Sequence, residues 1–223
     1  ILMTLLEKLR CLLTFGQGVA LPLPKIPEDK SPFQIFESWF NDASKAGILL
    51  PESMSVSSVD SNGQPSSRMV LLKSFDENGF VFYTNYGSRK SLELTENSKV
   101  ALLFHWGVLQ RQVRIEGIVR RTSSQQSEQY FHSRDRGSQI GAWASKQSQR
   151  CQTETELKDR EKYFADKFKG QQVPLPDFWG GYNVEPHYIE FWQGRANRLH
   201  DRMCFSKSNA DSSDTWQIFS LHP

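Results

Sequence analysis

Short apolar runs separated by turn signals constrain the fold of this chain more than any other feature. The runs MSVSSV, RMVLLKSF and FVFYTN are separated by the pairs Asn62-Gly63 and Asn78-Gly79. Asn-Gly between apolar runs is typical of tight hairpin turns, because both residues tolerate positive φ. Further strand-like runs follow: VALLFHW, QVRIEGIVRR, HYIEFW, RMCFS and WQIFSL. The pattern predicts an antiparallel sheet built from both halves of the chain.

Helical patterns precede and interrupt these runs. Ser31 and Gln34 form a capping-box pattern, and apolar residues then recur at helical spacing as far as Gly47. A short helix is expected near 88–97, and longer helices over 123–145 and 153–169. The chain has no βαβ repeat and no glycine-rich phosphate loop. The predicted fold class is therefore α+β, an antiparallel β-barrel, closed or partly closed, with peripheral helices.

The proline-rich stretch 21–30 separates an apolar segment from the rest of the chain. Residues 1–30 are expected to be a flexible N-terminal segment and linker, and 31–223 a single domain. Residues 1–23 read equally as an amphipathic helix, a targeting remnant or a disordered lead-in. With 38% hydrophobic residues, the chain of 223 residues can fill a substantial core.

Charge and cysteine content exclude several classes of partner. The formal net charge is only +2, so neither nucleic acid nor an anionic membrane is an expected partner. The three cysteines lie far apart without metal-ligand spacing, which predicts neither a disulfide framework nor a metal site. A reducing, cytoplasmic location is expected.

Basic residues in two segments, RMVLLK (68–73) and RLHDR (198–202), are candidates for binding phosphorylated molecules. Alternate residues of a strand face opposite sides, so Arg68 and Lys73 serve different neighbours. In SRKS, Arg89 and Lys90 stand at an expected helix start, where backbone N–H groups favour an anion. The alternative for each of these residues is an ordinary solvent-exposed charge.

Two further patterns suit an anion. Tyr130, Arg134 and Ser138 share a face if one helix continues through Gly137, although Ser138 could instead cap a second helix. If 198–202 is extended, Arg198, His200 and Arg202 share a face and repel one another unless an anion or carboxylate joins them. The polar stripe Gln112, Arg114 and Glu116 ordinarily meets only solvent.

These segments resemble the pyridoxine/pyridoxamine 5′-phosphate oxidase family, FMN enzymes with a split-barrel fold. The resemblance covers about residues 31–205, in the family's order, through RMVLLK, FYTNYGSRK, RQVRIEG, YFHSR, SQIGAWASKQS, WGGY and EFWQG followed by NRLHDR. It implies a homodimer with FMN at the subunit interface. It also implies that both subunits contribute to an FMN site lined by Arg68, Met69, Val70, Leu71, Tyr83, Thr84, Arg89, Lys90, Gln112, Gln147, Ser148, Trp192 and Arg202.

The same resemblance assigns the substrate phosphate to Lys73, Tyr130, Arg134 and Ser138, and the pyridine ring to the candidate catalytic residues Arg198 and His200. The implied reaction oxidises pyridoxine or pyridoxamine 5′-phosphate to pyridoxal 5′-phosphate, with hydride passing to the flavin and then to O2, giving H2O2. The alternative is a paralogue that binds FMN or pyridoxal phosphate as a carrier or sensor. Two departures motivate that alternative: the chain ends in SLHP where the family has Arg-Leu-X-Pro, and LPLPKIP replaces a basic segment.

Overall fold

One antiparallel sheet forms the body of the computed structural model, which describes residues 31–207 and 215–223. The expected N-terminal segment and linker, 1–30, lie outside the described residues. The sheet order is β2-β1-β5-β6-β7-β4-β3, with β8 paired to β7 and β9 to β8. The strands are β1 (Ser53–Val59), β2 (Pro65–Leu71), β3 (Ser74–Asp76), β4 (Gly79–Asn85), β5 (Lys99–Trp106), β6 (Arg111–Arg121), β7 (Trp179–Gln193), β8 (Asp201–Lys207) and β9 (Trp216–Ser220).

The helices follow the expected order with different bounds. They are α2 (Pro32–Lys45), α3 (Arg89–Glu96), α4 (Ser124–Ser133), α5 (Arg136–Ala144) and α6 (Glu156–Lys167), with short 3₁₀ turns η1 (Gly107–Leu109) and η2 (Ala196–Arg198). The predicted capping box at Ser31 and Gln34 is confirmed. None of the helices in the described ranges is long and apolar enough to span a membrane.

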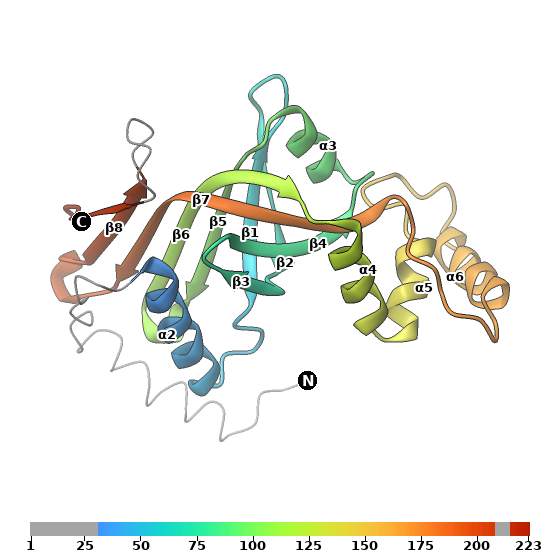
Figure 1. Ribbon diagram of the computed structural model, residues 1–223, viewed down its shortest axis with the longest axis horizontal. Coiled ribbons are helices and arrows are strands. Elements are labelled where there is room, and N and C mark those ends of the chain that lie inside the picture. The colour runs from blue at the N-terminus through green and yellow to red at the C-terminus, as the bar shows by residue number, and fades with distance from the viewer. Residues whose placement is uncertain (1–30, 208–214) are drawn as a thin grey trace.

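Figure 1 shows a curled sheet in the middle of an elongated molecule, with α4, α5 and α6 at one end and β8 at the other. The prediction of a partly closed antiparallel barrel with peripheral helices is confirmed. The 15-residue strand β7 links the two ends. Its first half pairs with β4, its second half pairs with β8, and β6 pairs along most of its length.

Two hydrophobic clusters hold these parts together. In the larger one, helix α2 lays Phe36 and Trp39 against the sheet, where the Phe36 ring lies 5.0 Å from both Phe80 and Phe104. Both residues are fully buried, and each such aromatic side chain stabilises the fold by burying a large apolar area. The smaller cluster joins α4, α5 and α6 around Phe131 and Phe164. The helical group thus has a core of its own beside the sheet.

The prediction of one helix over 123–145 is wrong. Helix α4 ends at Ser133, and Asp135 begins α5 by accepting a hydrogen bond from the Ser138 backbone N–H at 2.8 Å. Aspartate favours the N-cap position because its carboxylate satisfies a free backbone donor there. Arg134 therefore lies in an extended corner. The alternative in which Ser138 caps a second helix is also wrong, because the N-cap is Asp135 and Ser138 lies inside α5.

An extended backbone through 198–202 is also not found. Residues Asn197 and Arg198 both have positive φ, at 58° and 62°, and the strand begins only at Asp201. The shared face expected for Arg198, His200 and Arg202 is therefore wrong. The helix expected over 153–169 is shorter, at Glu156–Lys167.

Candidate functional site

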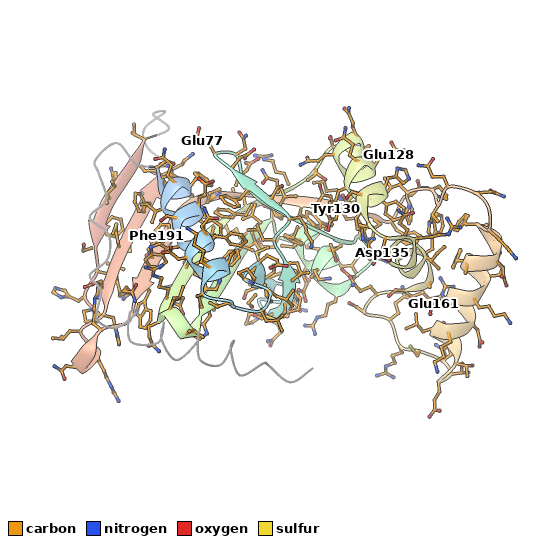
Figure 2. The ribbon with its side chains drawn as sticks, turned by 90° about the horizontal axis from the view of Figure 1, so that it is seen from below. Glu77, Glu128, Tyr130, Asp135, Glu161 and Phe191 are labelled. Carbon is orange, nitrogen blue, oxygen red and sulfur yellow. The ribbon has the colours of Figure 1, made fainter. Side chains whose placement is uncertain are left out.

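A cavity of about 980 Å³ lies between β2, β4, the start of α3 and the corner between α4 and α5. This volume suits a cofactor and a small substrate, since ligand pockets are typically about 300–1,000 Å³. Figure 2 shows Tyr130 and Asp135 on the helical side of the molecule. Of the residues expected in the site, fourteen line the cavity: Arg68, Met69, Val70, Leu71, Lys73, Tyr83, Thr84, Arg89, Lys90, Tyr130, Arg134, Ser138, Gln147 and Ser148.

One cationic cluster in the cavity is organised around a buried carboxylate. Glu93 Oε1 accepts from Arg89 Nε at 2.8 Å, and Oε2 accepts from Arg68 Nη2 at 3.1 Å. Burial alone would raise the pKa of Glu93, but hydrogen bonds from Ser58, Ser66 and the two arginines outweigh it and lower the pKa to about 2. Glu93 is therefore ionised at neutral pH and fixes both guanidinium groups.

Lys90 adds a buried cation to this cluster. Its side chain is only 7% exposed, and Nζ donates to Thr84 Oγ1 at 2.9 Å, Ser88 Oγ at 3.1 Å and Gln147 Oε1 at 2.9 Å. These acceptors are neutral. Burial, followed by the positive charge of Arg68, lowers the pKa of Lys90 to about 8. The three acceptors use all three N–H donors of Lys90, so the residue offers an anion its positive charge. An anion such as a phosphate group in the cavity would compensate this charge.

A second cationic cluster contains Tyr130, Arg134 and Ser138 from the helical wall and Lys73 from the segment between β2 and β3. The Arg134 guanidinium lies 4.9 Å from the centre of the Trp179 ring. Its Nη1 atom is buried and has no hydrogen-bond partner among the described residues. Burial lowers the pKa of Arg134. A buried donor without an acceptor costs free energy, and a phosphate oxygen is the kind of acceptor that would relieve it.

Stacked aromatic rings support this wall. The Tyr83 ring stacks on Tyr130 at 3.9 Å and on Trp179 at 5.5 Å. Gly181, two residues after Trp179, leaves room for the stack because it has no side chain. A Cβ at this position would lie 2.8 Å from Tyr83 Cε1 and 2.6 Å from Thr122 Oγ1. The Gly-Gly pair of the WGGY segment is thus required by close approach of aromatic side chains.

The other five expected residues, Gln112, Trp192, Arg198, His200 and Arg202, do not line this cavity. Most of them gather at the far end of β7. Trp192 pairs with Gln112 on one side and Arg202 on the other, and its ring lies 4.6 Å from His200. Figure 2 shows the neighbouring Phe191 well away from Tyr130. Trp179 and Trp192 are separated by roughly 40 Å of strand, at about 3.3 Å per residue.

The residues at this end of β7, namely Gln112, Trp192, His200 and Arg202, are called the far group below. A second buried carboxylate, that of Glu190, fixes Arg202 within this group. Glu190, 1% exposed, accepts from Arg202 Nε at 2.7 Å and from Arg114 Nη1 at 3.1 Å. Burial opposes its ionisation, but the two arginines lower its pKa. Arg202 Nη1 also donates to the His222 carbonyl at 3.0 Å, which ties the end of the chain to the group.

Several residues of the two clusters act through their neighbours and leave little signal in the sequence. Glu93 carries one usable signal, because it stands four residues after Arg89 on the expected helix. Glu190 carries no local signal, since its arginine partners lie on neighbouring strands. Trp179 and Asp135, which also line the cavity, belong to segments already noted but had no expected role.

Two family models match the chain. Residues 40–165 match the model described as pyridoxamine 5′-phosphate oxidase, and residues 179–223 match the pyridoxine 5′-phosphate oxidase C-terminal dimerisation region. The second range contains Trp192, Arg198, His200 and Arg202. The far group of β7 and β8 therefore lies in a region that the family uses for dimerisation.

Sequence and structure comparisons agree with these models. A pyridoxine/pyridoxamine 5′-phosphate oxidase from Colwellia psychrerythraea is 66% identical over 99% of this chain and 100% of its own length. A pyridoxine/pyridoxamine 5′-phosphate oxidase from Rubrobacter xylanophilus is 50% identical over 87% of this chain and 88% of its own length. The crystal structure of PhzG from Burkholderia lata, in complex with tetrahydrophenazine-1-carboxylic acid, has a TM-score of 0.85 at 26% identity, covering 92% of this chain and 100% of PhzG.

An FMN-binding protein from Nostoc punctiforme, related to pyridoxamine 5′-phosphate oxidase, shares the fold with a TM-score of 0.69 at 11% identity, covering 87% of this chain and 99% of its own. The family models and the close relatives carry the assignment of family. This chain belongs to the pyridoxine/pyridoxamine 5′-phosphate oxidase family of oxidoreductases.

Proposed function

We propose that this protein is an FMN-dependent oxidase that converts pyridoxine 5′-phosphate or pyridoxamine 5′-phosphate to pyridoxal 5′-phosphate, with reduction of O2 to H2O2. The observation that carries the proposal is that one cavity contains two separate cationic clusters. Arg68, Arg89 and Lys90 form the first, and Lys73 and Arg134 belong to the second. Two phosphate-bearing molecules, a flavin mononucleotide and a vitamin phosphate, require two such clusters.

The residues of the first cluster would hold the FMN phosphate. Lys90 contributes a buried ammonium group, and Arg68 and Arg89 are already oriented by Glu93. Arg89 uses only its Nε to bind Glu93, so its Nη donors can match phosphate oxygens in a pair. The Nη groups of Arg68 already donate to Val56, Ser58, Ser66 and Glu93, so Arg68 contributes mainly positive charge. Gln147 and Thr84, which share a 3.0 Å hydrogen bond, complete this wall.

The residues of the second cluster would hold the substrate phosphate. Arg134 offers a buried donor that has no acceptor in the described protein, and the Tyr130 hydroxyl and Ser138 lie on the same wall. FMN, when bound, supplies the redox chemistry by accepting a hydride and returning electrons to O2. The protein binds and orients the two molecules so that the reacting atoms meet.

We also propose that the enzyme is a homodimer whose two copies share each site. The far group at the end of β7 and β8 is separated from its own cavity by most of the length of β7, and it lies in the matched dimerisation region. A twofold dimer would bring Arg198 and His200 of a second copy to the cavity of the first. Because residues 68–148 and 192–202 would then both be needed, we propose that 31–223 acts as one functional unit.

His200 has a defined tautomer for this role. Its Nδ1 accepts a hydrogen bond from the Arg195 backbone N–H at 3.1 Å. In the neutral ring the proton therefore lies on Nε2, which is left to donate to a substrate. We propose that His200 and Arg198 orient the pyridine ring.

The test is an absorbance spectrum of the purified protein before and after anaerobic addition of pyridoxine 5′-phosphate. We expect a flavin spectrum that bleaches, followed in air by formation of pyridoxal 5′-phosphate and peroxide. A colourless protein that cannot be reconstituted with FMN would contradict the proposal. Bound flavin that never bleaches would instead identify a carrier or sensor.

A further inference from the structure

We propose that Glu93 is a positioning residue for flavin binding: its buried carboxylate orients Arg89 toward the phosphate group of FMN and holds the positive charge of Arg68 beside it. Glu93 does not line the cavity, whereas both arginines do. It would therefore act through them without touching the ligand. The inference rests on the proposed binding of FMN.

The contacts of Glu93 join the elements that carry the two arginines. Its side chain comes from α3, one turn after Arg89, and reaches the neighbouring strands β1 and β2. Oε2 accepts from Ser58 at 2.5 Å and from Ser66 at 2.6 Å, two residues that face each other across these strands. Glu93 thus fixes the distance between helix and strands as well as the two guanidinium groups.

The difference in solvent exposure between Glu93 and Arg89 indicates that the carboxylate fixes the arginine. Glu93 is 4% exposed, whereas the Arg89 side chain is 60% exposed and would be free to move without its partner. Arg68 is more enclosed, and it also donates to Ser58 Oγ at 2.6 Å and to Ser66. Fixing long side chains before a ligand arrives reduces the entropy lost on binding. The benefit to FMN should therefore be largest through Arg89.

The cluster keeps enough positive charge for a phosphate. Arg68, Arg89 and Lys90 contribute three positive charges and Glu93 one negative charge, which leaves a net charge of +2. A phosphate monoester carries about −1.5 to −2 at neutral pH. The carboxylate therefore reduces repulsion among the three cations without cancelling their attraction for the ligand.

An effect of net charge and an effect of side-chain orientation predict opposite changes in FMN affinity for the substitution Glu93→Gln. Glu93→Gln raises the net charge to +3, so charge alone would tighten FMN binding. Arg89 and Arg68, however, donate to different oxygens of Glu93, and glutamine replaces one of these oxygens with an NH2 donor. One of the two arginines would lose its acceptor, so loss of orientation would weaken binding. Glu93→Asp keeps the charge but shortens the side chain by one methylene, so only the orientation model predicts a loss for it.

The experiment titrates apoprotein with FMN and with riboflavin, which lacks the phosphate, and follows quenching of flavin fluorescence. We expect Glu93→Gln to weaken FMN binding by roughly twofold to a hundredfold, the range for one or two unfixed side chains. Glu93→Asp should weaken it less, and riboflavin affinity should not change. The matched control is Glu185→Gln, which removes the 2.9 Å ion pair with Arg120 outside the cavity and should change neither affinity.

Several outcomes separate this inference from the proposed function. If the unsubstituted apoprotein does not bind FMN, the proposed function fails. If it binds FMN but Glu93→Gln binds equally or more tightly, only the positioning role is wrong. Equal losses for FMN and riboflavin would also overturn it, because they would show general damage to the site. Should Glu93→Gln fail to fold, the same comparison is made with Glu93→Asp.

Discussion

The Nζ atom of Lys90 lies 2.9 Å from Oε1 of Gln147, which joins the start of α3 to the loop after α5. Thr84 Oγ1 donates to the same oxygen at 3.0 Å. A buried ammonium group thus has neutral partners only, and burial lowers its pKa to about 8. The affinity of the site for phosphate should therefore depend on pH in a range where most lysines remain charged.

The first prediction concerns FMN affinity against pH. As pH rises through about 8, Lys90 in the apoprotein loses its proton and its attraction for phosphate, so FMN affinity should fall by at most about tenfold per pH unit. Fluorescence titrations between pH 7 and 10 would measure this fall. Riboflavin affinity should stay flat, and Lys90→Gln should remove the Lys90-dependent part of the FMN slope. An identical slope in Lys90→Gln would contradict the prediction.

The same group should affect apoprotein stability in the opposite direction. Between about pH 8 and the ordinary lysine pKa of 10.5, the unfolded chain binds the proton and the folded chain does not. The free energy of unfolding should therefore gain a favourable Lys90 contribution as pH rises through this range. Urea unfolding of the unsubstituted protein and Lys90→Gln at each pH isolates the difference.

The second prediction separates two neighbouring arginines. Arg134→Gln should raise KM for pyridoxine 5′-phosphate by roughly tenfold to a hundredfold, the size expected for a lost charged hydrogen bond. Its stability should change little, because Nη1 has no protein partner among the described residues to lose. Steady-state kinetics and urea unfolding measure the two effects.

Arg136→Gln is the matched control. The Arg136 guanidinium donates to the Gln171 carbonyl at 2.9 Å and the Phe168 carbonyl at 2.5 Å, and the residue does not line the cavity. This variant should lose stability and keep its KM. A reversal of the two patterns would show that Arg134 is structural.

The third prediction tests whether two copies share a site. Assayed at a pyridoxine 5′-phosphate concentration below the KM of the unsubstituted enzyme, Arg134→Gln should lose most of its activity through its raised KM. Arg198→Ala should lose most of its activity as well and should still retain flavin. When the two variants are co-expressed with different tags, half of the dimers should be mixed, and one of the two sites in each should be intact. Activity should therefore return to about a quarter of normal, by statistical assembly of a twofold dimer. Activity no higher than that of either variant alone would rule out shared sites.

The fourth prediction concerns the aromatic stack. Gly181→Ala should destabilise the protein by about 1–3 kcal/mol, since the new Cβ collides with Tyr83 and Thr122. Gly141→Ala, within α5 and with nothing within 4 Å of its new Cβ, should instead stabilise by about 0.5–1 kcal/mol. Urea unfolding of the apoproteins compares the two. Equal effects would show that close approach at Gly181 does not matter.

The sequence predicted most of the strands and most of the expected residues that line the cavity, but it failed at two places in the local backbone. The polar residues around Arg134 suit a continuous helix and a helix break equally well, and the N-cap hydrogen bond of Asp135 selects the break. At Asn197 and Arg198, two consecutive positive φ values replace the extended backbone that alternation predicted. A local sequence pattern shows only which backbone conformation a segment prefers, and the contacts of the folded protein can select another conformation.

The sequence by itself determined the position of three basic residues: Arg68, Arg89 and Lys90 lie in segments whose strand or helix start follows from the local pattern. The pair of Glu93 with Arg89 follows from their spacing on α3. Only the tertiary structure decided that Glu93 also holds Arg68 and that Glu190 holds Arg202, because partners on different elements leave no periodic signal. It also separated Trp192 and His200 from the cavity. That separation depends on the length of β7 and on which strands pair with it, and strand pairing is set by contacts between residues far apart in the chain.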